Sequence, residues 1–136
     1  MPAGYSATPL AKKLGLKPGQ KVWRSGMPDS VAREIAADAD PLILVDEPVA
    51  GIDAAHVFTA SRADLEDKLA LLRARIRPDG TIWVSWPKKS SGVASDITED
   101  VVRDLALPLG LVDIKVCAVD ATWSGLKLVI RKSLRG

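Results

Sequence analysis

The chain has 136 residues, of which 47% are hydrophobic, and its 19 lysines and arginines against 17 aspartates and glutamates give a net charge of +2. This length fits one domain over residues 1–136 that buries roughly two-thirds of its unfolded surface, and the hydrophobic content argues against wholesale disorder. The near balance of charges argues against a protein whose main task is to hold a nucleic-acid backbone, but it leaves room for a local anion site.

The cysteine content and the amino terminus bear on the compartment. Cys117 is the only cysteine, which excludes a disulfide within the chain and fits a reducing compartment. Residues 1–15 lack the apolar segment of a signal peptide, and no apolar run approaches the ~20 residues of a membrane span. A cytoplasmic protein with no membrane association is therefore expected.

Apolar periodicity predicts an alternation of helices and strands along the chain. Taken in order, the expected elements are a helix over 7–15, a strand over 21–25, a helix over 28–37, strands over 41–46 and 54–60, a helix over 61–76, a strand over 81–86, a helix from Asp96 or Thr98 to about 107, and strands over 111–119 and 126–131. Such alternation is typical of a largely parallel sheet covered by helices, a three-layer α/β fold. The last two strands are expected to form an antiparallel hairpin.

Two of these segments have clear local signals. The continuous apolar run 41–46 is too short for a helix and predicts a strand buried on both faces. The helix over 61–76 has a leucine-rich stripe that includes Leu69, and Ser61 followed by Asp64 is close to a capping box at its start.

The strand over 81–86 leads into the best candidate for a binding site. It ends in Trp86, and Lys88, Lys89 and Ser90 follow. In open α/β sheets ligands bind at the carboxyl ends of the strands. An indole there offers a stacking surface, and two ammonium groups favour a phosphate or a carboxylate. The alternative is a solvated basic loop with Trp86 packed on the hairpin.

The other reactive residue types predict no catalytic or metal site. His56 is the only histidine, and between Ala55 and Val57 in a strand it is interpreted as a structural residue rather than a base or a zinc ligand. Cys117 is interpreted as a small buried hydrophobic residue. No G-x-S-x-G motif is present, so no serine nucleophile is predicted.

Three segments together resemble the S-adenosylmethionine-dependent methyltransferase fold. They are LGLKPGQKVWRSGMP, LRARIRPDGTIWVSW and the closing VDIKVCAVDATWSGLKLVIRK. The resemblance implies a Rossmann-like sheet that ends in an antiparallel hairpin. It also implies a cofactor site after the first strand, at Gly26. Asp46 and Glu47 follow about 20 residues later, the offset at which a carboxylate binds ribose hydroxyls.

A narrower resemblance covers nearly the whole chain. The segments PLAKKLGLKPG, GTIWVSWPK and WSGLKL resemble, in order and spacing, a family of short bacterial proteins known as domain of unknown function 3052. That family implies no activity.

The turn after Gly26 departs from a cofactor loop. Such a loop needs glycines so that the backbone can approach its ligand, but Met27 and Pro28 follow here, and neither G-x-G nor G-x-G-x-x-G is present. We therefore expect a non-catalytic protein without a cofactor, which binds a small anionic ligand or a protein partner at the carboxyl edge of its sheet. The alternatives are a minimal methyltransferase that uses S-adenosylmethionine and a weak RNA-binding module, against which the near-neutral charge argues. The oligomeric state is left open.

Overall fold

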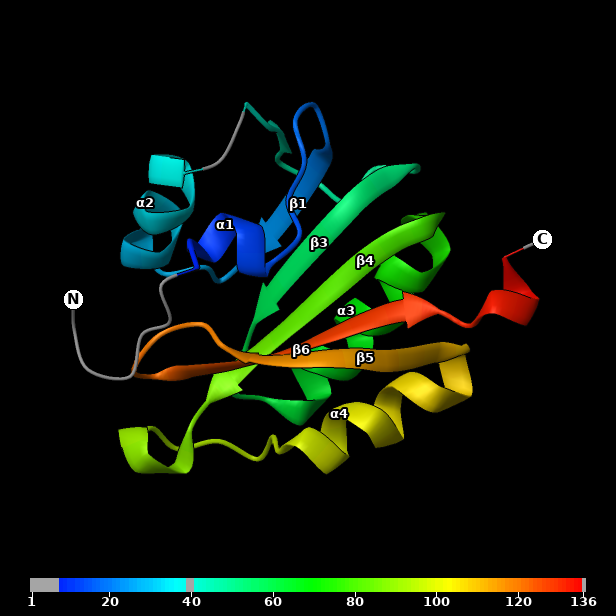
Figure 1. Ribbon diagram of the computed structural model, residues 1–136. Helices are drawn as coiled ribbons and strands as arrows, with labels where there is room; N and C mark the ends of the chain where they lie inside the picture. The colour runs from blue at the N-terminus through cyan, green and yellow to red at the C-terminus, as the bar shows by residue number, and fades with distance from the viewer. Residues whose placement is uncertain (1–7, 39–40, 136) are drawn as a thin grey trace.

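The computed structural model describes residues 8–38 and 41–135. Six strands form one sheet in the order β2-β1-β3-β4-β6-β5 (Figure 1). The strands are β1 (Lys21–Ser25), β2 (Ile43–Val45), β3 (Ile52–Phe58), β4 (Ile76–Pro87), β5 (Leu111–Ala118) and β6 (Trp123–Ile130). The helices are α1 (Leu10–Lys13), α2 (Asp29–Asp38), α3 (Arg62–Arg75) and α4 (Glu99–Ala106), with short 3-10 turns η1 (Lys89–Ser91), η2 (Leu107–Leu109) and η3 (Lys132–Leu134).

The pairing of the strands confirms a mostly parallel sheet with a closing antiparallel hairpin. Strand β1 is parallel to β2 and β3, and β3 is parallel to β4. Strand β6 is antiparallel to both β4 and β5. Strand β6 therefore lies between β4 and β5, and β5 forms the outer edge of the sheet.

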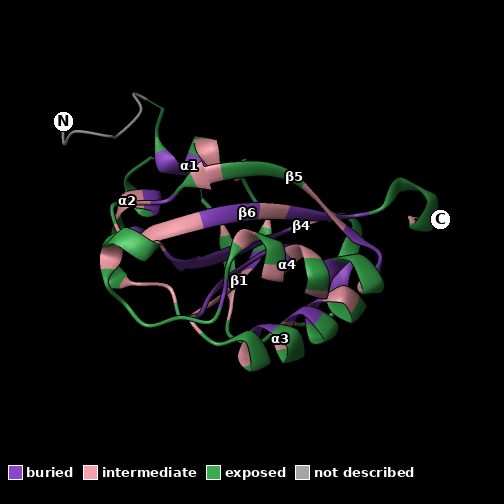
Figure 2. Cartoon of the chain, turned by 90° about the horizontal axis from the view of Figure 1, so that it is seen from below, coloured by how far each residue is buried: buried purple, intermediate pink, exposed green. Residues whose placement is uncertain are grey.

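Helices cover both faces of the sheet, so the predicted three layers are present (Figure 2). Helices α3 and α4 pack on one face over the larger core cluster, which includes the fully buried Leu65, Leu69 and Leu72. Helices α1 and α2 pack on the opposite face, called the α1 face below, over a smaller cluster that includes Trp83. The indole Nε1 of Trp83 donates to the carbonyl of Leu14 at 3.0 Å, which ties α1 to the sheet.

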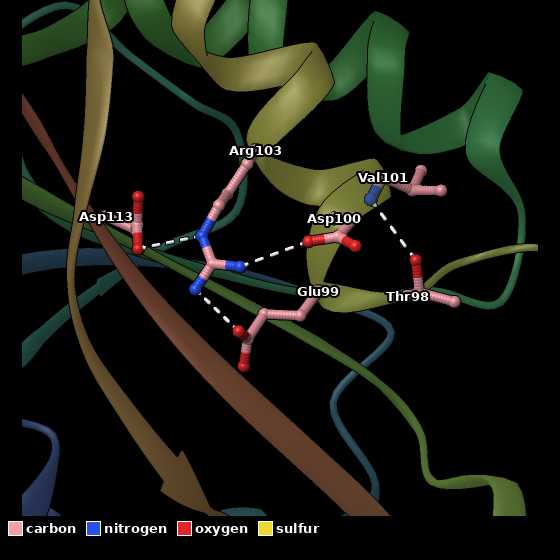
Figure 3. Close-up of polar contacts among 6 residues, drawn as sticks. All are labelled: Thr98, Glu99, Asp100, Val101, Arg103 and Asp113. Atoms are coloured by element: carbon pink, nitrogen blue, oxygen red, sulfur yellow. Dashed lines mark hydrogen bonds and ion pairs between the residues drawn. The ribbon is translucent and has the colours of Figure 1, made fainter.

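Local capping contacts agree with the predicted helix starts. The Ser61 hydroxyl accepts from the backbone N–H of Asp64 at 3.2 Å and so caps α3. Thr98, rather than Asp96, caps α4 by accepting from the N–H of Val101 (Figure 3). Asp96 instead accepts from the N–H of Arg62 at 2.6 Å, so the loop after β4 returns to the first turn of α3.

The prediction of a strand buried on both faces over 41–46 is wrong. The strand is β2, which lies at the edge of the sheet next to β1. Its side chains Ile43 and Leu44 are 50% and 53% exposed. An unbroken apolar run shows that both faces are hydrophobic, but burial of those faces depends on a neighbouring strand and a covering helix, which are not local properties.

Several element boundaries also differ from the prediction. Helix α1 spans only Leu10–Lys13, and residue 7 of the predicted helix lies outside the described residues. Strand β4 begins at Ile76 and not at the predicted residue 81, and its pairing with β3 is irregular over residues 77–80. Within residues 8–38 and 41–135, no helix has both the length and the apolar character needed to cross a membrane.

Candidate functional site

The carboxyl ends of four parallel strands meet at one edge of the sheet. Gly26 follows β1, Asp46 follows β2, Thr59 follows β3, and Lys88 follows β4. The predicted ligand-binding and cofactor-binding residues therefore lie at the ends of these strands or in the loops that follow them, at a common edge of the sheet.

Gly26 allows a close contact between two strand ends. Its φ of +67° lies in the left-handed region that favours glycine. A Cβ atom at this position would stand 2.5 Å from the backbone oxygen of Phe58, at the end of β3. Met27 and Pro28 follow with half-buried side chains, and Met27 packs against the core of the α1 face. Packing within the chain therefore contributes to the shape of this turn.

We expect Gly26→Ala to destabilise the protein by about 1–3 kcal/mol, because the substitution combines a strained φ with a clash against backbone. Gly19→Ala is the matched control. Gly19 has a φ of +75°, but nothing lies within 4 Å of the position of its Cβ atom. Denaturant titration should show the larger loss of stability for Gly26→Ala. Equal losses for the two variants would mean that the contact with Phe58 has no influence.

Asp46 and Glu47 are both exposed at the end of β2. The backbone at this point is held by Trp23, whose Nε1 donates to the carbonyl of Asp46 at 3.3 Å. The carboxylates of Asp46 and Glu47 form no ion pair within the described part of the chain. Both can accept hydrogen bonds from a ligand, and their predicted role in binding ribose stays a prediction.

Trp86 and Lys88 are placed differently from the prediction. Trp86 is only 7% exposed and packs in the core between the sheet and the α3–α4 layer, so it offers no open stacking surface. Its position in β4 points it toward that layer, on the same face as Ile82 and Val84. The Lys88 ammonium donates to the carbonyl of Asp120 in the β5–β6 turn at 2.8 Å, which leaves it half-buried.

Lys89 and Ser90 are exposed in the turn η1, directly after β4. The neighbouring Ser91 hydroxyl donates to the carbonyl of Lys88 at 2.6 Å, and Gly92 ends the turn with a φ of +75°. The backbone of this turn is thus held by its own contacts, while the side chains of Lys89 and Ser90 reach solvent. Their predicted role in binding an anion stays a prediction.

A buried pair that sequence patterns did not reveal joins β3 to β4. His56 Nε2 and Ser85 Oγ are 2.7 Å apart, and both residues are buried. The His56 ring stacks on Phe58 with centroids 4.3 Å apart. Burial and, secondarily, the positive charge of Arg24 lower the pKa of His56 to about 3. The ring is therefore neutral at pH 7, and its position agrees with a structural role.

Arg103 links α4 to the outer strand of the sheet (Figure 3). Its Nε donates to the Asp113 carboxylate on β5 at 3.0 Å, and its other nitrogens pair with Glu99 and Asp100. Hydrogen bonds to Asp113 and Glu99 raise the pKa of Arg103. Glu99 and Asp100 lie in the first turn of α4 and pair with this cation of the same helix.

Comparison with known families identifies the family of this chain. A family model described as "Protein of unknown function (DUF3052)" matches residues 11–132. The chain belongs to this family. Members of a family of unknown function give no activity to assign, and no curated protein matches the chain.

Solved structures similar to this DUF3052 protein are S-adenosylmethionine-dependent methyltransferases. One from Aquifex aeolicus has a TM-score of 0.65 at 13% identity, covering 89% of this chain and 88% of its own. The magnesium protoporphyrin IX methyltransferase from Synechocystis, with S-adenosylmethionine bound, has a TM-score of 0.59 at 12% identity, covering 88% and 74%. Fibrillarin from Aeropyrum pernix, also with S-adenosylmethionine bound, has a TM-score of 0.53 at 15% identity, covering 88% and 73%. At such identities the likeness establishes the Rossmann-like fold and nothing further.

Proposed function

We propose that this protein binds a small anionic ligand at the carboxyl edge of its sheet and does not catalyse a reaction on it. The observation that carries this proposal is the turn η1, in which Lys89 and Ser90 are exposed directly after the end of β4. An ammonium and a hydroxyl at this place can both donate to phosphate or carboxylate oxygens. A location in the cytoplasm is part of the same proposal.

The turn after β1 supports the non-catalytic part of the proposal. A Rossmann-type cofactor loop approaches its ligand through glycine backbone. Here Met27 and Pro28 occupy the equivalent place with half-buried side chains, and Met27 packs against the core cluster that includes Val31 of α2. The carbonyl of Pro28 accepts from the N–H groups of Val31 and Ala32 near the start of α2. The turn therefore serves the packing and start of α2.

The second candidate is a minimal methyltransferase that uses S-adenosylmethionine. Gly26, with its positive φ, and the exposed carboxylates of Asp46 and Glu47 lie at the ends of neighbouring strands. Ribose hydroxyls can donate to such carboxylates. The fold shared with methyltransferases, some with S-adenosylmethionine bound, favours the same edge of the sheet.

Calorimetric titrations with adenosine monophosphate and with S-adenosylmethionine test the proposal. Adenosine monophosphate carries both a phosphate and ribose hydroxyls. We expect it to bind, and we expect Lys89→Gln with Ser90→Ala to weaken the binding about tenfold, because hydrogen bonds to a charged group are lost. Lys132→Gln, which removes an exposed lysine from η3, is the control and should leave the affinity unchanged.

The same titrations distinguish the alternatives. Under the proposal, S-adenosylmethionine binds more weakly than ~1 μM, about −8 kcal/mol. A dissociation constant at or below that value, together with methyl transfer to any substrate, would contradict the proposal and support the second candidate, a methyltransferase. Native mass spectrometry of freshly purified protein would show a retained small ligand or, instead, a protein partner, and it would give the number of subunits.

A further inference from the structure

Four lysines from separate segments gather on the α1 face, away from the residues discussed above. They are Lys13 in α1, Lys17 before β1, Lys115 in β5 and Lys127 in β6, and they are called the lysine cluster below. Lys115 and Lys127 lie directly opposite each other in the β5–β6 pair. The Lys115 ammonium donates to the carbonyl of Lys13 at 3.3 Å. The Lys13 ammonium donates to the carbonyl of Ala118 at 3.0 Å.

Lys127 is a half-buried member of the cluster, in the strand between β4 and β5. Its neighbours Leu126 and Leu128 are buried in the core under α3 and α4, so the side chain of Lys127 points to the α1 face. Its ammonium lies beside Gly15, where a Cβ atom would stand 3.4 Å from Nζ. Burial lowers the pKa of Lys127, and the charges of Lys115 and Lys17 lower it further. These ammonium groups are thus close enough to repel one another.

Carboxylates pair with three cations of the described residues, and the lysine cluster is not among them. The ion pairs of the described residues are centred on Lys68, Arg77 and Arg103. None of the carboxylates in residues 8–38 and 41–135 lies within ion-pair distance of the lysine cluster. Like charges directly opposite on neighbouring strands oppose folding. The fold therefore maintains a local concentration of positive charge that it does not itself compensate.

We propose that the lysine cluster binds a compact, multiply charged phosphate ligand, namely a diphosphate or a longer phosphate chain. The cluster contains lysine only, and an ammonium acts on phosphate as a point charge, whereas the planar fork of arginine suits bidentate pairing. Lys13 and Lys115, although bonded to backbone carbonyls, keep further N–H groups for a ligand. Lys115 contacts the backbone of Lys13 and lies opposite Lys127, and both Lys13 and Lys127 are half-buried, which suits a compact anion better than an extended nucleic-acid backbone.

The test is a calorimetric titration of the full chain with sodium tripolyphosphate at low salt, where exposed charges are least screened. We expect Lys17→Gln with Lys127→Gln to weaken binding at least about tenfold, because two charge-assisted contacts are lost. Arg131→Gln with Lys132→Gln removes the same charge at exposed positions after β6 and should change the affinity less than about twofold. Lys17→Gln alone, at an exposed position, should still weaken binding if the double variant is poorly folded.

Each outcome decides the proposal. Binding of tripolyphosphate no tighter than sulfate, or equal weakening by both double variants, would show non-specific charge attraction and overturn it. Weakening of tripolyphosphate binding by Lys89→Gln with Ser90→Ala, but not by Lys17→Gln with Lys127→Gln, would place the anion at the carboxyl edge, which overturns this inference but supports the function proposed above. Tighter binding of a single-stranded RNA than of tripolyphosphate would also overturn it. Binding of adenosine diphosphate that competes with tripolyphosphate would identify a nucleotide as the source of the phosphates, and binding of the inorganic chain alone would identify free phosphates.

Discussion

Leu69→Ala should lower the free energy of unfolding by roughly 2–5 kcal/mol, the range for removing a large buried aliphatic side chain. Leu69 is 0% exposed at the centre of α3 and packs in the main core cluster. The lost transfer energy and the cavity left behind both contribute, because a packed interior relaxes only in part. Urea titration of the variant and the natural chain gives the difference directly.

The same helix supplies the control for this substitution. Leu71 lies two residues later on the solvent side of α3 and is 39% exposed. Leu71→Ala removes the same atoms, with the same change in helix propensity, and should cost less than about 1 kcal/mol. A loss below about 1 kcal/mol for Leu69→Ala as well would mean that α3 is not packed on the sheet.

Lowering the pH should reduce the free energy of unfolding through the protonation of His56 in the unfolded chain. Burial holds the pKa of His56 at about 3 in the folded state, against 6.5 when it is exposed. Because the folded pKa is lowered, the unfolded chain takes up the proton first as the pH falls below 6.5. The stability associated with neutral His56 is therefore complete above pH 6.5 and declines by about 1.4 kcal/mol for each pH unit below it, toward pH 3.

The contribution of His56 can be isolated with His56→Gln, whose amide can still bond to Ser85. Between pH 7 and pH 5 the natural chain should lose about 2 kcal/mol more stability than this variant, as measured by denaturant titration at each pH. Parallel curves for the two proteins would show that His56 titrates normally in the folded state and that its ring is open to water.

Local sequence features determined the elements whose signals lie within a few residues. The apolar stripe and the Ser61 cap predict α3 almost to the residue, because helix periodicity and capping depend on neighbours three and four positions apart. The closing hairpin is likewise a short-range feature, and the three-layer α/β class follows from the order of the elements. The common edge that gathers Gly26, Asp46 and Lys88 follows from parallel pairing alone.

Only the tertiary structure decided which apolar surfaces are covered and which charges meet. Alternation in β4 groups Trp86 with Ile82 and Val84, but only the position of the α3–α4 layer shows that this face is buried. The same limit applies to the apolar run that becomes the exposed edge strand β2. The lysine cluster joins residues 13 and 17 to residues 115 and 127, which strand order brings together across most of the chain. Periodicity says which residues share a face, whereas burial and charge contacts depend on the partner that the fold places opposite that face.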